Sequence, residues 1–335
     1  MSIIIVIGFF VFVSLCPPCS ASPAHVAALS TAEIATSATD HQALMSFRSL
    51  IKGDPLEALN SWGNQSIPMC RWHGVACGMR GHRRGRVLAL DLSGLNLLGS
   101  ISSSIDLENL NLSSNSIGGN IPPELTACVQ LQFVCLSHNN LQGVIPSALG
   151  VLSNLRGIDL RYNMLKGSVP LELASLHNLE VLALGYNNLT GNIPVEIGNM
   201  EGLIRLHLES NMIVGEIPKQ IANLTNLTHL YLYLNGLTGL VPASLGGLQK
   251  LQILSLSDNQ LSGPIPPSLG NLSSLVFLNL RANGLTGTIP ESLGNLNLLN
   301  ALSLTSNSLT GIPKCLCAML QRLNLFNWVL TFFPE

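Results

Sequence analysis

The stretch LQFVCLSHNNLQGVIPSALGVLSN, residues 131–154, decides the fold of this chain, because the sequence from about residue 87 to 313 repeats it with variations. Each unit carries one asparagine, and successive asparagines are 24 residues apart. A fixed period of this length is typical of solenoids, in which each unit packs only against its neighbours. The asparagines that mark the units are Asn115, Asn139, Asn163, Asn187, Asn211, Asn235, Asn259, Asn283 and Asn307.

The shared pattern LxxLxLxxNxLxGxIP is that of leucine-rich repeats. Apolar residues at alternate positions, such as Leu206 and Leu208, predict one short strand in each unit with its apolar side facing inward. Leu189, Ile193 and Ile197 then close the coil, and single coils bury such residues only when neighbours stack on them. Each buried Leu or Ile contributes roughly 1.5–3 kcal/mol. We therefore expect an α/β solenoid of about ten 24-residue repeats across residues 87–313.

The asparagine column has a structural explanation. A buried amide both donates and accepts hydrogen bonds, so it can pair with backbone groups of its own coil and of the adjacent one. Losing such a partner inside a protein costs about 1–3 kcal/mol. We interpret these asparagines as structural residues and not as a binding site.

The second half of the unit indicates a particular form of leucine-rich repeat. It reads LQGVIPSALG, LTGNIPVEIG, LSGPIPPSLG and LTGTIPESLG in different repeats. This LxGxIP form resembles the plant-specific leucine-rich repeat of receptor-like kinases, receptor-like proteins and polygalacturonase-inhibiting proteins, over roughly residues 40–313. The resemblance implies an extracellular superhelix with a second short strand after the GxIP turn. A receptor-like kinase would continue into a membrane helix and a kinase domain, so the chain resembles a truncated receptor ectodomain.

Composition argues against a nucleic-acid partner. The chain has 335 residues with 16 basic and 18 acidic side chains, a net charge of −2, and therefore no excess of positive charge for phosphates. One basic cluster, formed by Arg80, Arg83, Arg84 and Arg86, precedes the first repeat. A solvated connecting loop explains it better than a binding patch.

The N-terminus predicts secretion. Residues 3–15 form an apolar run, and Cys19-Ser20-Ala21 offers a cleavage site before Ser22, as in a secretory signal peptide over residues 1–21. A retained anchor is the alternative, but the run is shorter than the ~20 residues that a membrane span needs. We expect the secretory pathway, and then the apoplast or the extracellular side of the plasma membrane. Residues 22–39, rich in Ala, Ser and Thr, predict a flexible lead-in.

Residues 40–86 predict an N-terminal cap. Asp40 is a plausible N-cap of a helix whose apolar face, including Ala43, Leu44 and Phe47, would cover the open end of the first repeat. The segments DHQALMSFRSLIKGDP, LNSWG and CRWHGVAC are similar to the plant leucine-rich-repeat N-terminal cap. The resemblance, with secretion, implies a disulfide between Cys70 and Cys77.

The variable positions of the strands supply a candidate ligand site. In xxLxLxx these residues project onto the concave face, and all four tyrosines of the chain occur there within four consecutive repeats. Tyr and Arg are enriched at interface hot spots. The alternative is that strand positions simply favour aromatic residues. The predicted ligand-binding residues are Arg161, Tyr162, Tyr186, Arg205, His207, Glu209, Tyr231 and Tyr233.

The histidines and the remaining cysteines suggest no metal site. His138, His207 and His229 share the concave face but lie on different coils, and plain polar surface explains them better than a metal centre. Cys135 is predicted to be an exposed thiol on that face, and Cys128 a small apolar filler. The sequence leaves open the redox state of both, as it does for Cys315 and Cys317.

Sequons fit a secreted glycoprotein. They occur at Asn64, Asn111, Asn188, Asn223, Asn226 and Asn271.

No catalytic motif occurs, so we expect neither an enzyme nor a cofactor. Residues 314–335 depart from the repeat as a divergent tail, which suggests a truncated gene product, and this tail is too polar for a membrane span. The predicted function is extracellular recognition of a peptide or protein in plant defence or developmental signalling, with a co-receptor kinase as a further partner. The alternatives are a secreted inhibitor of microbial polygalacturonase-like enzymes and a truncated receptor remnant.

Overall fold

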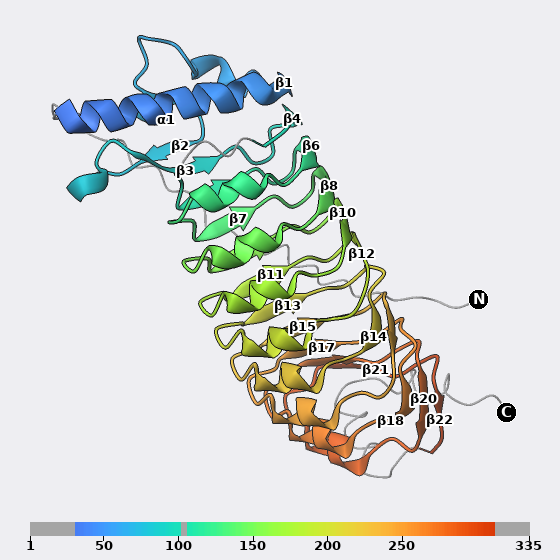
Figure 1. The fold of residues 1–335 in the computed structure, drawn as a ribbon. Coiled ribbons are helices and arrows are strands. Elements are labelled where there is room, and N and C mark those ends of the chain that lie inside the picture. The colour runs from blue at the N-terminus through green and yellow to red at the C-terminus, as the bar shows by residue number, and fades with distance from the viewer. Residues whose placement is uncertain (1–30, 102–105, 312–335) are drawn as a thin grey trace.

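The chain forms a curved stack of coils in a computed structural model that describes residues 31–101 and 106–311 (Figure 1). The predicted signal peptide and the tail after residue 313 lie outside the described residues. One α-helix, α1 (Thr31–Leu50), lies across the N-terminal end of the stack. The repeats follow it in chain order to the other end, which confirms the predicted solenoid.

A sheet of 11 strands runs along the inner, concave side of the arc, with one strand from the cap and one from each coil. Its first pair is antiparallel, and each later pair is parallel. Equivalent residues of adjacent coils are direct neighbours in this register. The strands are β2 (Val75–Cys77), β3 (Val87–Asp91), β5 (Asn109–Asn111), β7 (Phe133–Cys135), β9 (Gly157–Asp159), β11 (Val181–Ala183), β13 (Arg205–His207), β15 (His229–Tyr231), β17 (Ile253–Ser255), β19 (Phe277–Asn279) and β21 (Ala301–Ser303).

A second set of short strands forms three smaller sheets. They are β1 (Ile51–Gly53), β4 (Leu98–Gly99), β6 (Ser116–Asn120), β8 (Asn140–Val144), β10 (Met164–Gly167) and β12 (Asn188–Leu189) in one, β14 (Val214–Glu216) and β16 (Gly236–Thr238) in another, and β18 (Ser262–Pro264), β20 (Gly284–Gly287) and β22 (Ser308–Leu309) in the last.

The position of this second strand differs from expectation. It precedes the Ile-Pro pair instead of following the GxIP turn, as β8 does before Ile145 and Pro146. Proline has no N–H for a strand ladder, and Pro146 is the N-cap of the next helix. The strand therefore ends before the proline.

The return of each regular coil is a 3-10 helix, and among the described residues the α-helix is confined to the cap. The cap also holds short 3-10 helices at η1 (Ala58–Ser61), η2 (Met69–Arg71) and η3 (Gly81–Arg83). Those of the coils are η4 (Pro123–Ala127), η5 (Ser147–Val151), η6 (Leu171–Ser175), η7 (Val195–Asn199), η8 (Lys219–Asn223), η9 (Ala243–Gly247), η10 (Pro267–Asn271) and η11 (Glu291–Asn295).

The core is one continuous column of leucines and isoleucines inside the coils. The residues predicted to close a coil are buried: Leu189, Ile193 and Ile197 are 0%, 3% and 3% exposed. The strand residues Leu206 and Leu208 are both 0% exposed. The repeat pattern thus predicted the core correctly.

The asparagine column joins each coil to the one before it. The side-chain amide of Asn187 donates to the carbonyls of Leu160 (2.9 Å) and Leu184 (3.0 Å), and its oxygen accepts from the backbone N–H of Leu165 (3.0 Å). Leu160 and Leu165 belong to the preceding coil and Leu184 to the same coil. The asparagines are therefore structural, as predicted.

We predict that Asn187→Ala lowers the free energy of unfolding by about 3 kcal/mol, because it leaves buried backbone groups of two coils unpaired. Asn307 makes the same three bonds at the far end of the described stack, where it is partly exposed, so Asn307→Ala should cost less. Guanidinium unfolding of both variants measures the difference. Equal losses would contradict a role for burial.

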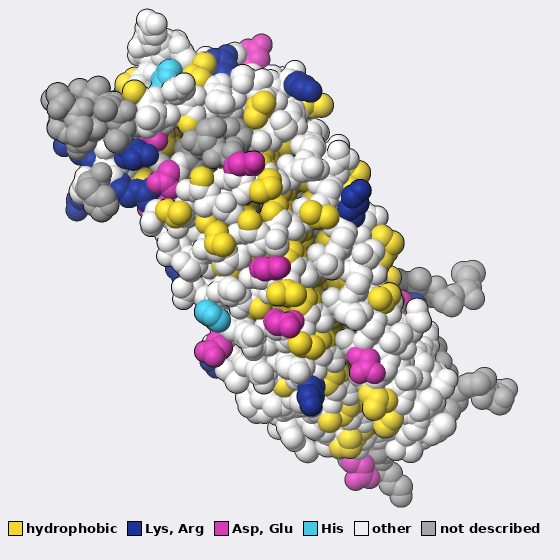
Figure 2. All heavy atoms as spheres, viewed as in Figure 1, with side chains coloured by type: hydrophobic (Ala, Val, Ile, Leu, Met, Phe, Trp, Pro, Cys, Tyr) yellow, Lys and Arg dark blue, Asp and Glu magenta, His cyan; other side chains and the backbone are white. Residues whose placement is uncertain are grey.

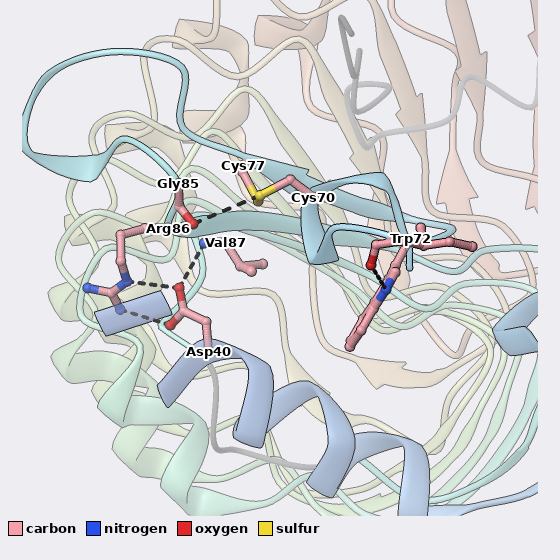
Figure 3. Close-up of a disulfide and its surroundings, with 8 residues drawn as sticks. Asp40, Cys70, Trp72, Cys77, Gly85, Arg86 and Val87 are labelled. Atoms are coloured by element: carbon pink, nitrogen blue, oxygen red, sulfur yellow. Dashed lines mark hydrogen bonds and ion pairs between the residues drawn. A yellow bond between two sulfur atoms is a disulfide. The ribbon is translucent and has the colours of Figure 1, made fainter. Parts of the chain in front are cut away.

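The cap helix begins earlier than the sequence predicted. Because α1 starts at Thr31, Asp40 lies inside the helix and is not its N-cap, and residues 31–39 of the predicted lead-in are helical. Asp40 is 3% exposed, and its carboxylate accepts from Arg86 Nε (2.8 Å), Arg86 Nη2 (3.0 Å) and the backbone N–H of Val87 (2.9 Å) (Figure 3). The aspartate therefore fastens the helix to the first strand of the solenoid.

The cap has its own apolar centre, which continues into the repeat core. Leu44 and Phe47 of α1 are buried against it, and the rings of Trp62 and Trp72 stack with centroids 5.7 Å apart. The predicted disulfide between Cys70 and Cys77 is present, with a Cα–Cα distance of 5.5 Å (Figure 3). The helix covers the open end of the first repeat, as expected.

We predict that Asp40→Ala destabilises the protein by about 2–3 kcal/mol, because the buried N–H of Val87 and the guanidinium of Arg86 lose their acceptor. Glu180→Ala is the matched control, since it breaks a pair with Arg156 in which both side chains are substantially exposed. Such surface pairs contribute less than about 1 kcal/mol. Thermal unfolding of the two variants compares them, and a similar loss in both would refute the anchoring role of Asp40.

Candidate functional site

The concave side of the middle coils carries a connected group of aromatic side chains, which we call the aromatic cluster: His138, Tyr162, Tyr186, His207, His229, Tyr231 and Tyr233. They come from the strands β7 to β15 and from the turns that follow them. Adjacent strands lie ~4.8 Å apart, so side chains at equivalent positions of adjacent coils pack side by side.

One part of the cluster is a stack of three rings. His138, Tyr162 and Tyr186 each directly precede a column asparagine and have φ of 54°, 54° and 56°, in the left-handed region. The same turn in each coil therefore sends their side chains in the same direction. The ring centroids of His138 and Tyr162, and of Tyr162 and Tyr186, are 4.1 Å apart, with interplanar angles of 14° and 12°.

The other part lies one and two coils further along. The rings of His207 and Tyr231 stack at 4.6 Å, and Tyr233 meets Tyr231 edge-on at 6.3 Å. The hydroxyls of Tyr186 and Tyr233 are 2.8 Å apart, within hydrogen-bonding distance. This bond joins the two parts into one surface across the middle of the sheet.

Charged side chains lie beside the aromatic rings. Arg161 makes a bidentate ion pair with Asp159, with Nε–Oδ1 and Nη2–Oδ2 distances of 2.9 and 2.8 Å. Glu209 is 4% exposed, and its Oε1 lies 3.3 Å from Nδ1 of His207. The predicted site residue Arg205 lies on β13 and is partly exposed. All eight predicted ligand-binding residues therefore belong to one region.

Burial controls the protonation of the cluster. It is the largest cause that raises the pKa of Tyr231 to about 12, with a further contribution from the charge of Glu209. Burial also raises the pKa of Tyr162 and that of Tyr233. Near neutral pH these tyrosines are therefore neutral phenols that can donate and accept hydrogen bonds.

The pKa of His229 is strongly lowered. Burial, followed by the positive charge of Arg205 and by His207, lowers its pKa from 6.5 to about 4. Desolvation disfavours the charged imidazolium, so His229 is neutral over most of the acidic range.

We predict that the stability of the protein decreases as pH falls from about 6.5 to 4. In this window His229 is protonated in the unfolded chain and neutral in the folded one, so proton binding favours unfolding. His229→Gln removes this contribution and should flatten the dependence. Melting curves of both proteins from pH 7.5 to 4.5 provide the check. Parallel curves would show that His229 contributes nothing.

Sequence reasoning missed two residues of this site. Asp159 is the partner of Arg161, and the signal that could have found it is that residues two apart on a strand share a face. Gly185 was missed because it has no side chain. A Cβ at Gly185 would lie 2.6 Å from Cδ and Oε1 of Glu209, so the glycine leaves the space that this carboxyl group occupies.

Cys135 corrects another expectation. It is 2% exposed and is not a free thiol, so it does not present an exposed sulfhydryl on the concave face. Its neighbours in register, Asn111 and Asp159, also lie on this face, and Asp159 is only 4% exposed.

The predicted sequons differ in their accessibility. Asn64, Asn188, Asn223 and Asn271 are exposed, while Asn226 is partly exposed and its amide donates to the carbonyl of Glu201 (3.0 Å). Asn111 on β5 is partly exposed, and its side-chain oxygen accepts from Ser113. The exposed sequons remain the better acceptors for a glycan.

The basic cluster before the first repeat is partly neutralised. Several Lys and Arg side chains gather beside the N-terminal cap (Figure 2). Arg83 pairs with Glu108 (2.6 Å) and Asp106 (3.6 Å), and Arg86 pairs with Asp40 (2.8 Å). These contacts support the interpretation of a structural connection.

In residues 31–101 and 106–311, no three His, Cys, Asp or Glu side chains are grouped so that they could hold a metal ion. Within the same residues, no helix combines the length and the apolar character needed to cross a bilayer.

Comparison with known families identifies the segments of the chain. Residues 37–78 match the leucine rich repeat N-terminal domain. Residues 106–128, 129–189, 201–261 and 225–285 match leucine rich repeat families. The matches cover most of the cap and the coils that carry the aromatic cluster.

Individual relatives are plant receptor kinases. Over 92 residues the chain is 46% identical to the Arabidopsis thaliana LRR receptor-like serine/threonine-protein kinase EFR, a match that covers 26% of this chain and 8% of the kinase. The chain is also 39% identical to the ectodomain of the A. thaliana receptor kinase GASSHO1/SCHENGEN3, whose structure was solved in complex with CASPARIAN STRIP INTEGRITY FACTOR 2. The TM-score is 0.81, and the match covers 84% of this chain and 34% of that one.

A further solved structure contains a peptide and a second receptor. It is the Arabidopsis receptor kinase HAESA with the peptide hormone IDA and the co-receptor SERK1, and its sequence is 34% identical to this chain. The TM-score is 0.76, and coverage is 82% of this chain and 47% of the HAESA chain in that structure. This chain thus spans less than half the length of each of these relatives.

Proposed function

This chain belongs to the leucine-rich-repeat family, and from that premise we propose that it is an extracellular recognition domain that binds a peptide or protein on the concave face. The aromatic cluster is the proposed centre of the binding surface, and the proposed function is ligand capture without catalysis. Defence or developmental signalling in a plant is the proposed setting.

The observation that carries this proposal is the concentration of aromatic residues. All four tyrosines of the chain belong to one connected surface of four consecutive coils, in which Tyr186 and Tyr233 join the two parts. Tyrosine buries a large apolar area and keeps a polar group, which is why it is enriched among the residues that dominate binding energy. The strand register fixes these rings before a ligand arrives, so little conformational entropy would be lost on binding.

The similar solved structures support the choice of ligand and partner. GASSHO1/SCHENGEN3 is in complex with CASPARIAN STRIP INTEGRITY FACTOR 2, and HAESA is in complex with a peptide hormone and a co-receptor. By analogy we propose a secreted peptide as the ligand and a co-receptor kinase as the second partner. Such a function requires that the domain be displayed or released outside the cell.

We predict that replacing Tyr186, His207 and Tyr231 together by Ala weakens peptide binding by about 100-fold or more, because hot-spot residues each contribute at least ~2 kcal/mol. Random-sequence peptides displayed on phage are selected on the wild-type protein, and the affinities of the selected peptides are measured for both proteins by calorimetry.

The matched control replaces Phe277, Asn279 and Arg281 by Ala. These residues lie on or beside β19 of the same sheet, outside the aromatic cluster. The control should retain binding, and both triple variants should keep the circular-dichroism spectrum of the wild type. Equal affinity of the selected peptides for the wild type and the cluster variant would exclude the cluster as the binding surface.

A further inference from the structure

We infer that Glu209, together with His207, is the point of the concave face that receives a cationic group of the ligand, either an ammonium or a guanidinium. The inference rests on the proposed function, since it assumes that a peptide lies on the aromatic cluster, and it adds the chemistry that the peptide must carry. It follows from the unpaired polar atoms of these two residues, from their charge and from the rings around them.

The carboxylate of Glu209 is buried with one oxygen unpaired. The residue is 4% exposed, and Oε1 contacts Nδ1 of His207, whereas Oε2 is buried and has no hydrogen-bond partner. Nε2 of His207 is likewise buried without a partner, and this residue is 8% exposed. Buried polar groups in native proteins are nearly always paired, and an unpaired one costs about 1–3 kcal/mol. Two such atoms in one side-chain pair indicate a place for a partner from outside the chain.

No arginine or lysine of the described residues pairs with this carboxylate. Arg161 is close enough for the charge of Glu209 to contribute to raising its pKa. Its guanidinium, however, is already bound by both oxygens of Asp159, and no ion pair joins Arg161 to Glu209 in the described part of the chain. Gly185 leaves space for the carboxyl group and has no side chain that could donate a hydrogen bond to it. Among the basic side chains of the described residues, only His207 is therefore in direct contact with Glu209.

The unpaired atoms define the chemistry of the missing partner. In the His207 tautomer that donates from Nδ1 to the carboxylate, Nε2 is an acceptor, as Oε2 is. A partner that satisfies both must offer at least two N–H donors, and a positive charge would make the bond to the carboxylate roughly twice as strong as a neutral one. Ammonium and guanidinium groups meet both conditions, whereas a carboxylate, phosphate or sulfate meets neither.

The aromatic rings favour the same partner. The charge of Glu209 contributes to the raised pKa of both Tyr231 and Tyr233, which places both phenols in its electrostatic range. Tyr231 also stacks on the ring of His207, at 4.6 Å. A cation beside aromatic faces gains about 0.5–2 kcal/mol from the ring quadrupoles. Side-chain rotations of the kind that are common on binding would admit the group to the buried oxygen.

The test compares phage-displayed random peptides selected in parallel on the wild type, on Glu209→Gln and on a double variant in which Ala replaces Tyr186 and Tyr231. Peptides that need the aromatic cluster should share a Lys, an Arg or a free N-terminus at one fixed position. We expect Glu209→Gln to bind these peptides at least about tenfold more weakly, because it loses a charge-assisted hydrogen bond.

Two further variants separate charge from shape. Gly185→Ala keeps the charge of Glu209 but displaces its carboxyl group, and should weaken the same peptides. Glu180→Gln removes one negative charge from the same face, where the carboxylate is already paired with Arg156, and should not weaken them. Melting temperatures are measured for all variants, so that a loss of binding is interpreted only in folded protein.

Synthetic peptides distinguish the source of the cation. Weaker binding after N-terminal acetylation identifies the terminal ammonium, and weaker binding after replacement of the basic residue by Gln identifies its side chain. If neither change matters, or if the preference survives in Glu209→Gln while binding still needs the tyrosines, the cation site is wrong and the proposed function stands. If no selected peptide depends on the tyrosines, the proposed function fails, and this inference fails with it.

Discussion

The hydrogen bonds of the asparagine column are the constraint on which the solenoid depends. Each regular coil must turn sharply after its concave strand, and the turn leaves backbone carbonyls and N–H groups inside the stack where water cannot reach them. An amide such as that of Asn187 satisfies such groups in its own coil and in the preceding one. The same bonds fix the spacing of the coils, and this spacing sets the register of the parallel strands. The leucine core supplies the driving force, but the asparagines determine where each turn occurs.

Much of the fold could be predicted because the same pattern of apolar residues and asparagine recurs in successive repeats. The identity of the core residues, the strand of each coil and the capping helix follow from periodicity and from the need to cover the first coil. The start of α1 could not be predicted, because Asp40 has the chemistry of an N-cap and its actual partners, Arg86 and Val87, are more than 40 residues away in the sequence. The second strand lies before the Ile-Pro pair and not after it, because the proline has no N–H to donate to a strand ladder.

The site was predicted in its location but not in its contacts. Alternation along β15 places Tyr231 on the concave face, whereas Tyr186 reaches that face through the left-handed turn after β11. It does not tell which side chains lean toward a neighbouring coil, and this is what pairs Tyr186 with Tyr233 across 47 residues. The role of Gly185 depends on the absence of a side chain, and a glycine has no functional group that would mark it as a site residue. Glu209 is buried beside Gly185 of the preceding coil, and Cys135 is buried and not a free thiol; the pattern of one repeat contains no information about either.

The parallel register also sets a length scale for anything that lies along the concave face. Adjacent strands are ~4.8 Å apart, whereas an extended peptide advances ~3.3 Å for each residue. The steps from the coil of Tyr162 to that of Tyr233 therefore span about 14 Å, the length of roughly four extended residues. Because the two spacings do not match, an extended ligand running along the arc cannot present the same residue position to every coil. The aromatic cluster would thus contact ligand side chains at irregular intervals along the ligand. A peptide bound by a repeat protein therefore need not have a repetitive sequence.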